Sequence, residues 1–234
     1  MSHGSTPPRK KPLLRGVSHE AAAYLSAPAA VALWASAPAS LKGGVAAYGL
    51  SLTVLFLMSA VYHRPTWRPR MRDWLGRFDH SAIFLLIAGT GTPLFLCLGP
   101  GAGRTVLWVV WAGALAGVAM SLAWAKVPKA LMAGLCVLLG WAAVPVLPDM
   151  MRVLGPAVMA LVVAGGVLYT LGAFVYARKW PDPFPAVFGY HEVFHLCVIA
   201  AAVLHFTAVA GALPSVGGEA GTAAIGVVKA LGGG

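Results

Sequence analysis

The residues of this sequence best suited to chemistry are two histidines four positions apart, His191 and His195. Positions i and i+4 of an α-helix lie on one face, so both imidazoles can bind the same metal ion. His63, at the end of a different apolar segment, can supply a third nitrogen. Three histidines leave one position of a tetrahedral zinc ion open to water, as in catalytic zinc sites. Zinc lowers the pKa of such a water to about 7, so the pattern predicts hydroxide at neutral pH.

Two further side chains can serve such a site. Asp79 can orient the water or accept its proton. Ser59 lies four residues before His63 and therefore one turn away on the same helical face. Its hydroxyl can hold a substrate carbonyl or the water. His80, the neighbour of Asp79, is expected to pack within the protein or to support a metal ligand through a hydrogen bond.

Residues 191–195 also read H-E-x-x-H, the helix signature of zinc metalloproteases, in which the glutamate is the general base. Glu192 therefore competes with Asp79 for the role of base, and spacing alone leaves both open. Zinc is the expected cofactor, with iron and manganese as alternatives, because imidazole ligands do not by themselves select the metal.

Two other histidines are expected to be structural. His205 lies about 15 Å beyond His195 along the same helix, and we expect it to form a hydrogen bond between helices. His19, near the N-terminus, is expected to be a residue of the tail and the membrane interface.

The composition decides what kind of element positions these residues. Residues of the AVILMFWYC group make up 59% of the 234 residues and charged residues only 10%, against about 25% charged in a typical soluble domain. This excludes a soluble enzyme and a disordered chain and predicts a multi-pass protein of the cell (plasma) membrane. The net charge of +10 comes from short basic clusters between apolar runs, which indicates membrane orientation and no nucleic-acid partner.

Seven apolar runs are long enough to cross a membrane. They cover residues 21–38, 44–62, 78–98, 105–124, 130–146, 153–176 and 191–213. If the N-terminus is cytoplasmic, 13 of the 17 lysines and arginines fall on the cytoplasmic side, as the positive-inside rule requires. The predicted fold is therefore all-α, a bundle of seven transmembrane helices with the N-terminus in the cytoplasm and the C-terminus outside.

This topology divides the chain into three segments and predicts that the candidate residues meet at one site. Residues 1–20 form a basic cytosolic tail, 21–213 the transmembrane domain and 214–234 a flexible glycine-rich tail. His63 ends the second span at its cytoplasmic mouth, Asp79 begins the third there, and His191 and His195 begin the seventh. Three segments distant in sequence thus bring imidazoles and a carboxylate to one depth in the membrane.

The motifs around these residues resemble the hemolysin III family, the bacterial relatives of the progestin and adipoQ receptors (PAQR) and, more distantly, of alkaline ceramidases. The resemblance covers about residues 15–206 and lies in S-A-V-Y-H at 59–63, F-D-H-S-A-I at 78–83, A-G-T-G-T-P at 88–93, G-Y-H-E-V-F-H at 189–195 and H-F at 205–206.

The resemblance implies seven transmembrane helices, an inner N-terminus, and zinc held by the residues that match His63, His191 and His195. The family's serine and aspartate match Ser59 and Asp79, with the aspartate reaching the metal through water, which favours Asp79 over Glu192 as the base. The sequence departs from the family where many relatives carry a Glu/Asn/His pattern entering the first span, since only S-H-E stands here, at residues 18–20.

The leading hypothesis is a zinc-dependent, amidase- or ceramidase-like membrane hydrolase that cleaves amide or ester bonds of lipids, with membrane lipids as its partners. A non-catalytic membrane sensor or receptor-like protein with structural zinc, acting in membrane homeostasis, is the alternative. A pore-forming cytolysin is suggested by the family name, although few polar residues line the spans. The H-E-x-x-H segment suggests an intramembrane protease as a further alternative.

Overall fold

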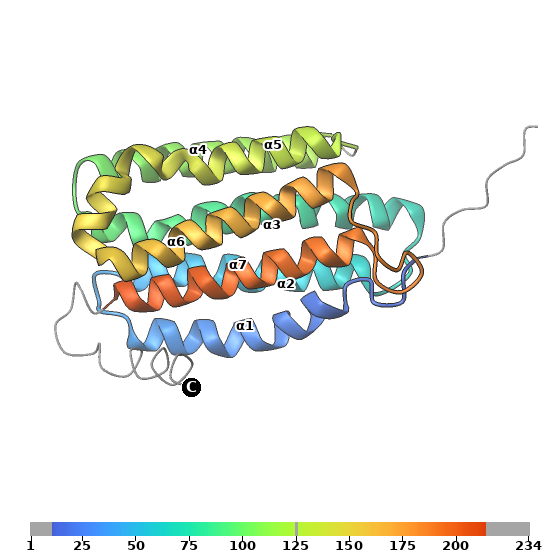
Figure 1. Ribbon diagram of the computed structural model, residues 1–234, viewed down its shortest axis with the longest axis horizontal. Helices are drawn as coiled ribbons and strands as arrows, with labels where there is room; N and C mark the ends of the chain where they lie inside the picture. Colours follow the sequence, from blue (N-terminus) through green and yellow to red (C-terminus); the bar gives the residue numbers. More distant parts are fainter. Residues whose placement is uncertain (1–10, 125, 214–234) are drawn as a thin grey trace, which may run out of the picture.

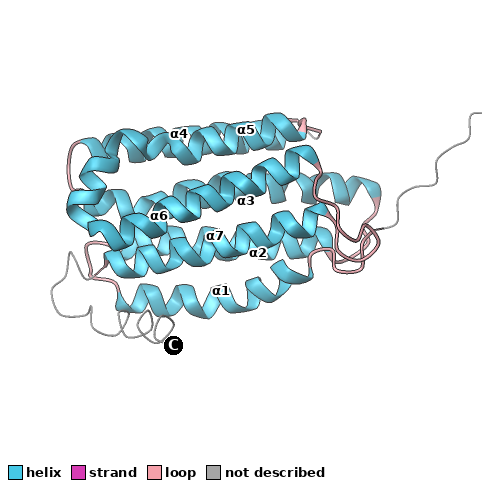
Figure 2. Ribbon diagram, in the orientation of Figure 1, coloured by secondary structure: helices cyan, strands magenta, loops and turns pink. Residues whose placement is uncertain are grey.

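The structure, a computed structural model, describes residues 11–124 and 126–213. The predicted tail at 214–234 and the first ten residues of the predicted cytosolic tail lie outside the described residues. The described residues form seven α-helices and one 3-10 helix, whose arrangement is drawn in Figures 1 and 2. These are α1 (Val17–Ser36), α2 (Lys42–His63), α3 (Pro69–Cys97), α4 (Ala102–Ala123), α5 (Lys129–Gly140), η1 (Trp141–Val146), α6 (Leu147–Arg178) and α7 (Tyr190–Ala212).

The all-helical class is as predicted, since the described ranges contain no strand beyond a single bridge between Phe184 and Phe188. Within the part of the chain that the structure describes, five helical stretches are long and apolar enough to cross a membrane. They are α2, α3, α4, α7 and the continuous run Lys129–Arg178, which contains α5, η1 and α6. Large apolar side chains such as Trp108, Leu138 and Val203 are exposed on the outside, as expected where lipid replaces water as the solvent.

Prolines explain why the run Lys129–Arg178 is not one straight helix. Pro145 has no backbone N–H to donate, and the surrounding residues Trp141–Val146 form the tighter 3-10 helix η1. Gly155 leaves the helical conformation with φ of 78°, because the following Pro156 disfavours a helical conformation in the residue before it.

The helices that position the site lie side by side although they come from opposite ends of the chain. Consecutive helices α1, α2, α3 and α4 pack against one another, as do α6 and α7. Helix α7 also contacts α1 and α3, so the last helix closes against the first (Figure 1). One end of this group gathers the start of α1, the end of α2 and the start of α7.

Candidate metal centre

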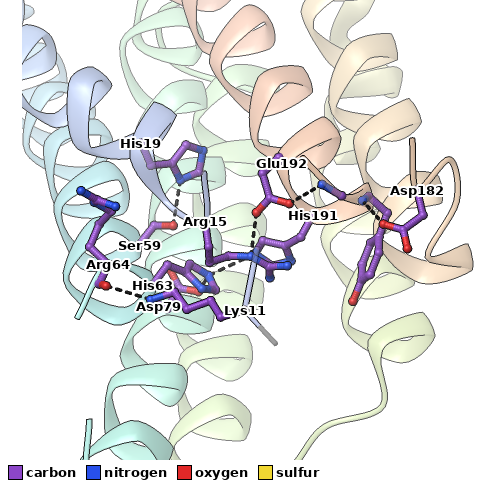
Figure 3. A network of polar contacts seen from close by, with 12 residues as sticks. Lys11, Arg15, His19, Ser59, His63, Arg64, Asp79, Asp182, His191 and Glu192 are labelled. Atoms are coloured by element: carbon purple, nitrogen blue, oxygen red, sulfur yellow. Dashed lines mark hydrogen bonds and ion pairs between the residues drawn. The ribbon is translucent and has the colours of Figure 1, made fainter. Parts of the chain in front are cut away.

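The three histidines singled out by the sequence lie together. His63 is the last residue of α2, and His191 and His195 occupy the first two turns of α7. One ligand atom from each lies within 4.8 Å of the others, and the Nε2 atoms of His63 and His191 are 3.1 Å apart (Figure 3). His191 and His195 are buried and His63 is partly buried. The arrangement can hold a metal ion, and these three histidines are called the metal centre below.

The geometry of these side chains fits zinc. Zn–N bonds of 2.0–2.1 Å in a tetrahedron place two ligand nitrogens roughly 3.3 Å apart, close to the separation of the His63 and His191 Nε2 atoms. The Nδ1 atoms of His191 and His195 are buried, and neither has a hydrogen-bond partner in the described part of the chain. Buried ring nitrogens without a partner are unusual in native proteins, so these imidazoles are suited to a further group at the site.

Asp79 and Ser59 both lie beside the three histidines. The Oδ2 atom of Asp79, which is buried in α3, is 3.7 Å from the Nε2 atom of His63. That separation is too long for a direct hydrogen bond. The buried Ser59 hydroxyl approaches the Asp79 carboxylate and forms a 2.8 Å hydrogen bond with Nδ1 of His19.

Glu192 has two structural contacts at the start of α7. Its Oε2 atom accepts a 2.8 Å hydrogen bond from the Gly189 N–H and so caps the helix. Its Oε1 atom forms an ion pair with Nε of Arg15 at 2.6 Å. The side chain is almost fully buried. Both carboxylate oxygens therefore stabilise the segment that carries the two α7 histidines.

The expectation for His19 was wrong: it belongs to the site. Its side chain is 2% exposed, and its ring stacks on that of His195 with centroids 3.7 Å apart and planes 10° apart. His19 lies in the first turn of α1, which begins at Val17. Because α1 packs against α7, the His19 ring reaches His195. The sequence did carry a signal for this position of His19. The residue stands at the start of the first apolar run, on the same predicted side of the membrane as His63, His191 and His195.

Residues 11–16 lie across the end of the bundle next to the metal centre, a feature that the sequence did not reveal. The N–H groups of Leu13 and Leu14 donate to the carbonyls of Ala186 and Val187, in the loop between α6 and α7, at 3.1 and 3.0 Å. Gly16 adopts φ of +81°, and a Cβ at this position would stand 2.7 Å from the Cβ of His63. A glycine here therefore lets the segment approach the metal centre.

The other two histidines considered in the sequence analysis, His205 and His80, lie in the wall of a cavity. His205 Nε2 donates to the Val162 carbonyl at 3.0 Å, which confirms the expected hydrogen bond between helices. His80 is half-buried and lines the cavity near the metal centre.

The cavity has a volume of about 1040 Å³ and begins at the metal centre. It follows α7 from His195 to His205, about 15 Å along the helix axis. Away from the centre its walls are mostly apolar and include Leu94, Phe95 and Val198. A polar end joined to a long apolar space is the arrangement expected for binding an amphiphile.

Comparison with known proteins is consistent with this site. A family model described as "Haemolysin-III related" matches residues 8–206, a range that contains every site residue named above. Hemolysin-3 of Bacillus cereus is 30% identical over 205 residues, covering 84% of this chain and 89% of that protein. Hemolysin-3 homolog of Bacillus subtilis (strain 168) is 31% identical over 162 residues, covering 68% and 72%.

A human protein is also similar. Monocyte to macrophage differentiation factor of Homo sapiens is 26% identical over 168 residues, which cover 69% of this chain and 67% of that protein. The apolar helices and the bacterial relatives together make the chain a multi-pass protein of the cell membrane.

Proposed function

The chain belongs to the haemolysin-III-related family, and we propose that it is a zinc-dependent hydrolase of amide or ester bonds in lipids. The observation that carries this proposal is the cluster of His63, His191 and His195 at the polar end of an apolar cavity, with Asp79 beside it. The three imidazoles would bind the zinc ion and leave one of its positions free.

We propose with it a topology of seven spans with the N-terminus in the cytoplasm. Support comes from the helices α1 to α7, which overlap the seven apolar runs of the sequence, and from the excess of lysine and arginine on the side of the N-terminus. In this topology the metal centre lies near the cytoplasmic face, and the cavity extends from it into the membrane.

The reaction divides between the metal and the neighbouring side chains. Zinc held by His63, His191 and His195 would act as a Lewis acid and would lower the pKa of water to about 7. Asp79 accepts the proton of the attacking water and returns it to the leaving amine or alcohol. Ser59 donates a hydrogen bond to the substrate carbonyl oxygen as negative charge develops there.

His19 controls whether Ser59 can act in this way. When His19 carries its proton on Nδ1, it donates to the Ser59 oxygen, and the hydroxyl hydrogen of Ser59 is left to donate to the neighbouring Asp79 carboxylate or, when a substrate binds, to its carbonyl oxygen. The stacking of His19 on His195 holds the ring in this position. His19 is therefore a positioning residue for Ser59.

The contacts of Glu192 favour Asp79 as the base. A base needs a free oxygen within reach of the water, and the two oxygens of Glu192 contact Gly189 and Arg15. The same contacts argue against an intramembrane protease in which Glu192 acts as the base.

The test is release of fatty acid from amide and ester lipids by the zinc-loaded protein in lipid nanodiscs. We expect Asp79→Asn to lower kcat by about 10²–10⁴, the range for loss of a general base, while zinc remains bound. Glu192→Gln keeps an oxygen to cap α7 and should retain most of the rate. If the wild type and a His191→Ala variant release equally little fatty acid from every lipid, the hydrolase proposal is wrong.

A sensor with structural zinc is the second candidate, because the three histidines join the end of α2 to the start of α7. In that case, removal of zinc lowers thermal stability, and no lipid is hydrolysed under any condition.

A further inference from the structure

The mouth of the cavity, its end beside the metal centre, is rich in positive charge. Among the described residues, four basic side chains line the cavity there, and the carboxylates in the lining are Asp79 and Asp182. The basic residues are Lys11, Arg15, Arg72 and Lys129. Arg15 is paired with Glu192, which leaves the positive charges of Arg72, Lys11 and Lys129.

Lys129 begins α5 and is held among aromatic rings. Its ammonium donates a 2.8 Å hydrogen bond to the Tyr190 hydroxyl and lies 4.5 Å from the centre of the Tyr176 ring. The ring of Tyr176 is in turn 5.9 Å from that of His191, so a single aromatic ring separates Lys129 from the metal centre. Within residues 11–124 and 126–213, no carboxylate lies within ion-pair distance of Lys129.

Lys11 stands at the same mouth, in the segment that crosses the end of the bundle (Figure 3). Its ammonium donates to the backbone carbonyls of Arg64 and Pro65 at 2.8 and 3.4 Å. Burial and the neighbouring Arg64 and Arg15 guanidinium groups lower the pKa of Lys11. Cationic side chains held this close repel one another, and a bound anion would relieve that repulsion.

We propose that the ligand of this cavity is an amphiphile with an anionic head group, a carboxylate or a phosphate, which binds Lys129 at the mouth, where Lys11 and Arg72 add positive charge. Its apolar chain would occupy the cavity along α7. This inference rests on the proposed function in one respect, that the bond to be cleaved lies at the histidines. The head group would then belong to the leaving side of the substrate, as in an N-acyl amino acid or an acylglycerol phosphate.

General attraction between basic residues and anionic lipid at the membrane surface is the competing explanation. The chain offers a matched control for it in Lys126. This residue is exposed, lies three positions before Lys129, and stands outside the cavity lining. A surface effect would respond equally to loss of either lysine, whereas a binding site at the mouth would respond to Lys129.

The experiment measures equilibrium binding to the full-length, zinc-loaded protein in nanodiscs of uncharged lipid, in an Asp79→Asn background that blocks the proposed hydrolysis. The ligands are N-palmitoylglycine, palmitoylethanolamide as its uncharged counterpart, and palmitoylglycerol phosphate. Loss of one charged contact at a partly buried site is expected to change Kd by about tenfold. The variants compared are Lys129→Gln, Lys129→Arg and Lys126→Gln.

We expect both anionic ligands to bind about tenfold more tightly than palmitoylethanolamide, and the tighter of the two identifies carboxylate or phosphate as the natural group. Lys129→Gln should remove the preference, and Lys129→Arg and Lys126→Gln should keep it. The inference is overturned if the protein with Lys129 intact binds charged and uncharged ligands equally tightly. It is also overturned if Lys126→Gln loses as much of the preference for anionic ligands as Lys129→Gln does.

The outcomes separate the two proposals. Hydrolysis of uncharged lipids by the wild type, with no preference for anionic ligands, overturns only the inference about the head group. A preference for anionic ligands in a protein that hydrolyses none of them overturns only the hydrolase.

Discussion

The ion pair between Arg15 and Glu192 ties residues 11–16 to the start of α7, and its loss should destabilise the protein measurably. Replacement of Arg15 by methionine keeps most of the aliphatic volume. Among the described residues it leaves the buried Glu192 carboxylate with only the Gly189 N–H as a partner. Removal of one partner of a buried pair costs about 3–5 kcal/mol. The Arg15 side chain is 18% exposed, so water can partly replace it, and we expect about 2–3 kcal/mol.

A double-mutant cycle isolates the ion pair from other effects of each substitution. Glu192→Gln removes the charge and keeps an oxygen for the Gly189 N–H, so it should cost about 1 kcal/mol. The double variant Arg15→Met/Glu192→Gln no longer buries an unpaired carboxylate and should be more stable than Arg15→Met alone. The expected coupling between the two sites is about 1–2 kcal/mol.

The assay is the free energy of unfolding in mixed detergent micelles, followed by loss of helical circular dichroism as denaturing detergent is added. Zinc is kept at one fixed excess for all four proteins, because bound metal adds to stability. Additive effects within about 0.5 kcal/mol, or an Arg15→Met protein as stable as the wild type, would refute the reasoning.

Two further predictions concern the neighbours of the metal centre. Gly16→Ala should destabilise the protein by about 1–3 kcal/mol in the same assay, because alanine is strained at φ of +81° and its Cβ would meet that of His63. Gly134→Ala, inside α5 with open space around it, should instead be neutral or stabilising by up to about 1 kcal/mol, and a Gly16→Ala protein that behaves like it would contradict the proposed contact. His19→Phe should keep the stacking on His195 but lose the hydrogen bond to Ser59, so lipid hydrolysis should fall about tenfold or more with zinc still bound; an unchanged rate would remove His19 from the site.

Local spacing in the sequence was enough to find the three histidines. His191 and His195 share a helical face, and His63 ends an apolar run, so the helices alone bring them to one end of the bundle. The same reasoning placed Asp79 beside them, and the structure has it 3.7 Å from His63. Their roles as ligands and base remain predictions.

Contacts between the first and last helices were out of reach of such reasoning. His19 and Arg15 join the site because α1 packs on α7, and no periodicity in either segment specifies that pairing. The backbone hydrogen bonds of Leu13 and Leu14 are equally invisible, since main-chain groups carry no sequence signal. Glu192 was read as a candidate base from a five-residue motif, while one of its two contacts is with Arg15, 177 positions away.

Zinc content measured by elemental analysis tests the central claim most directly. The account predicts about one zinc per chain in the purified wild type, loss of that zinc in His191→Ala/His195→Ala, and retention in His205→Ala, which alters a buried histidine of the same helix outside the cluster. A wild type that binds no zinc after zinc is added back, or a double variant that binds as much as the wild type, would contradict it.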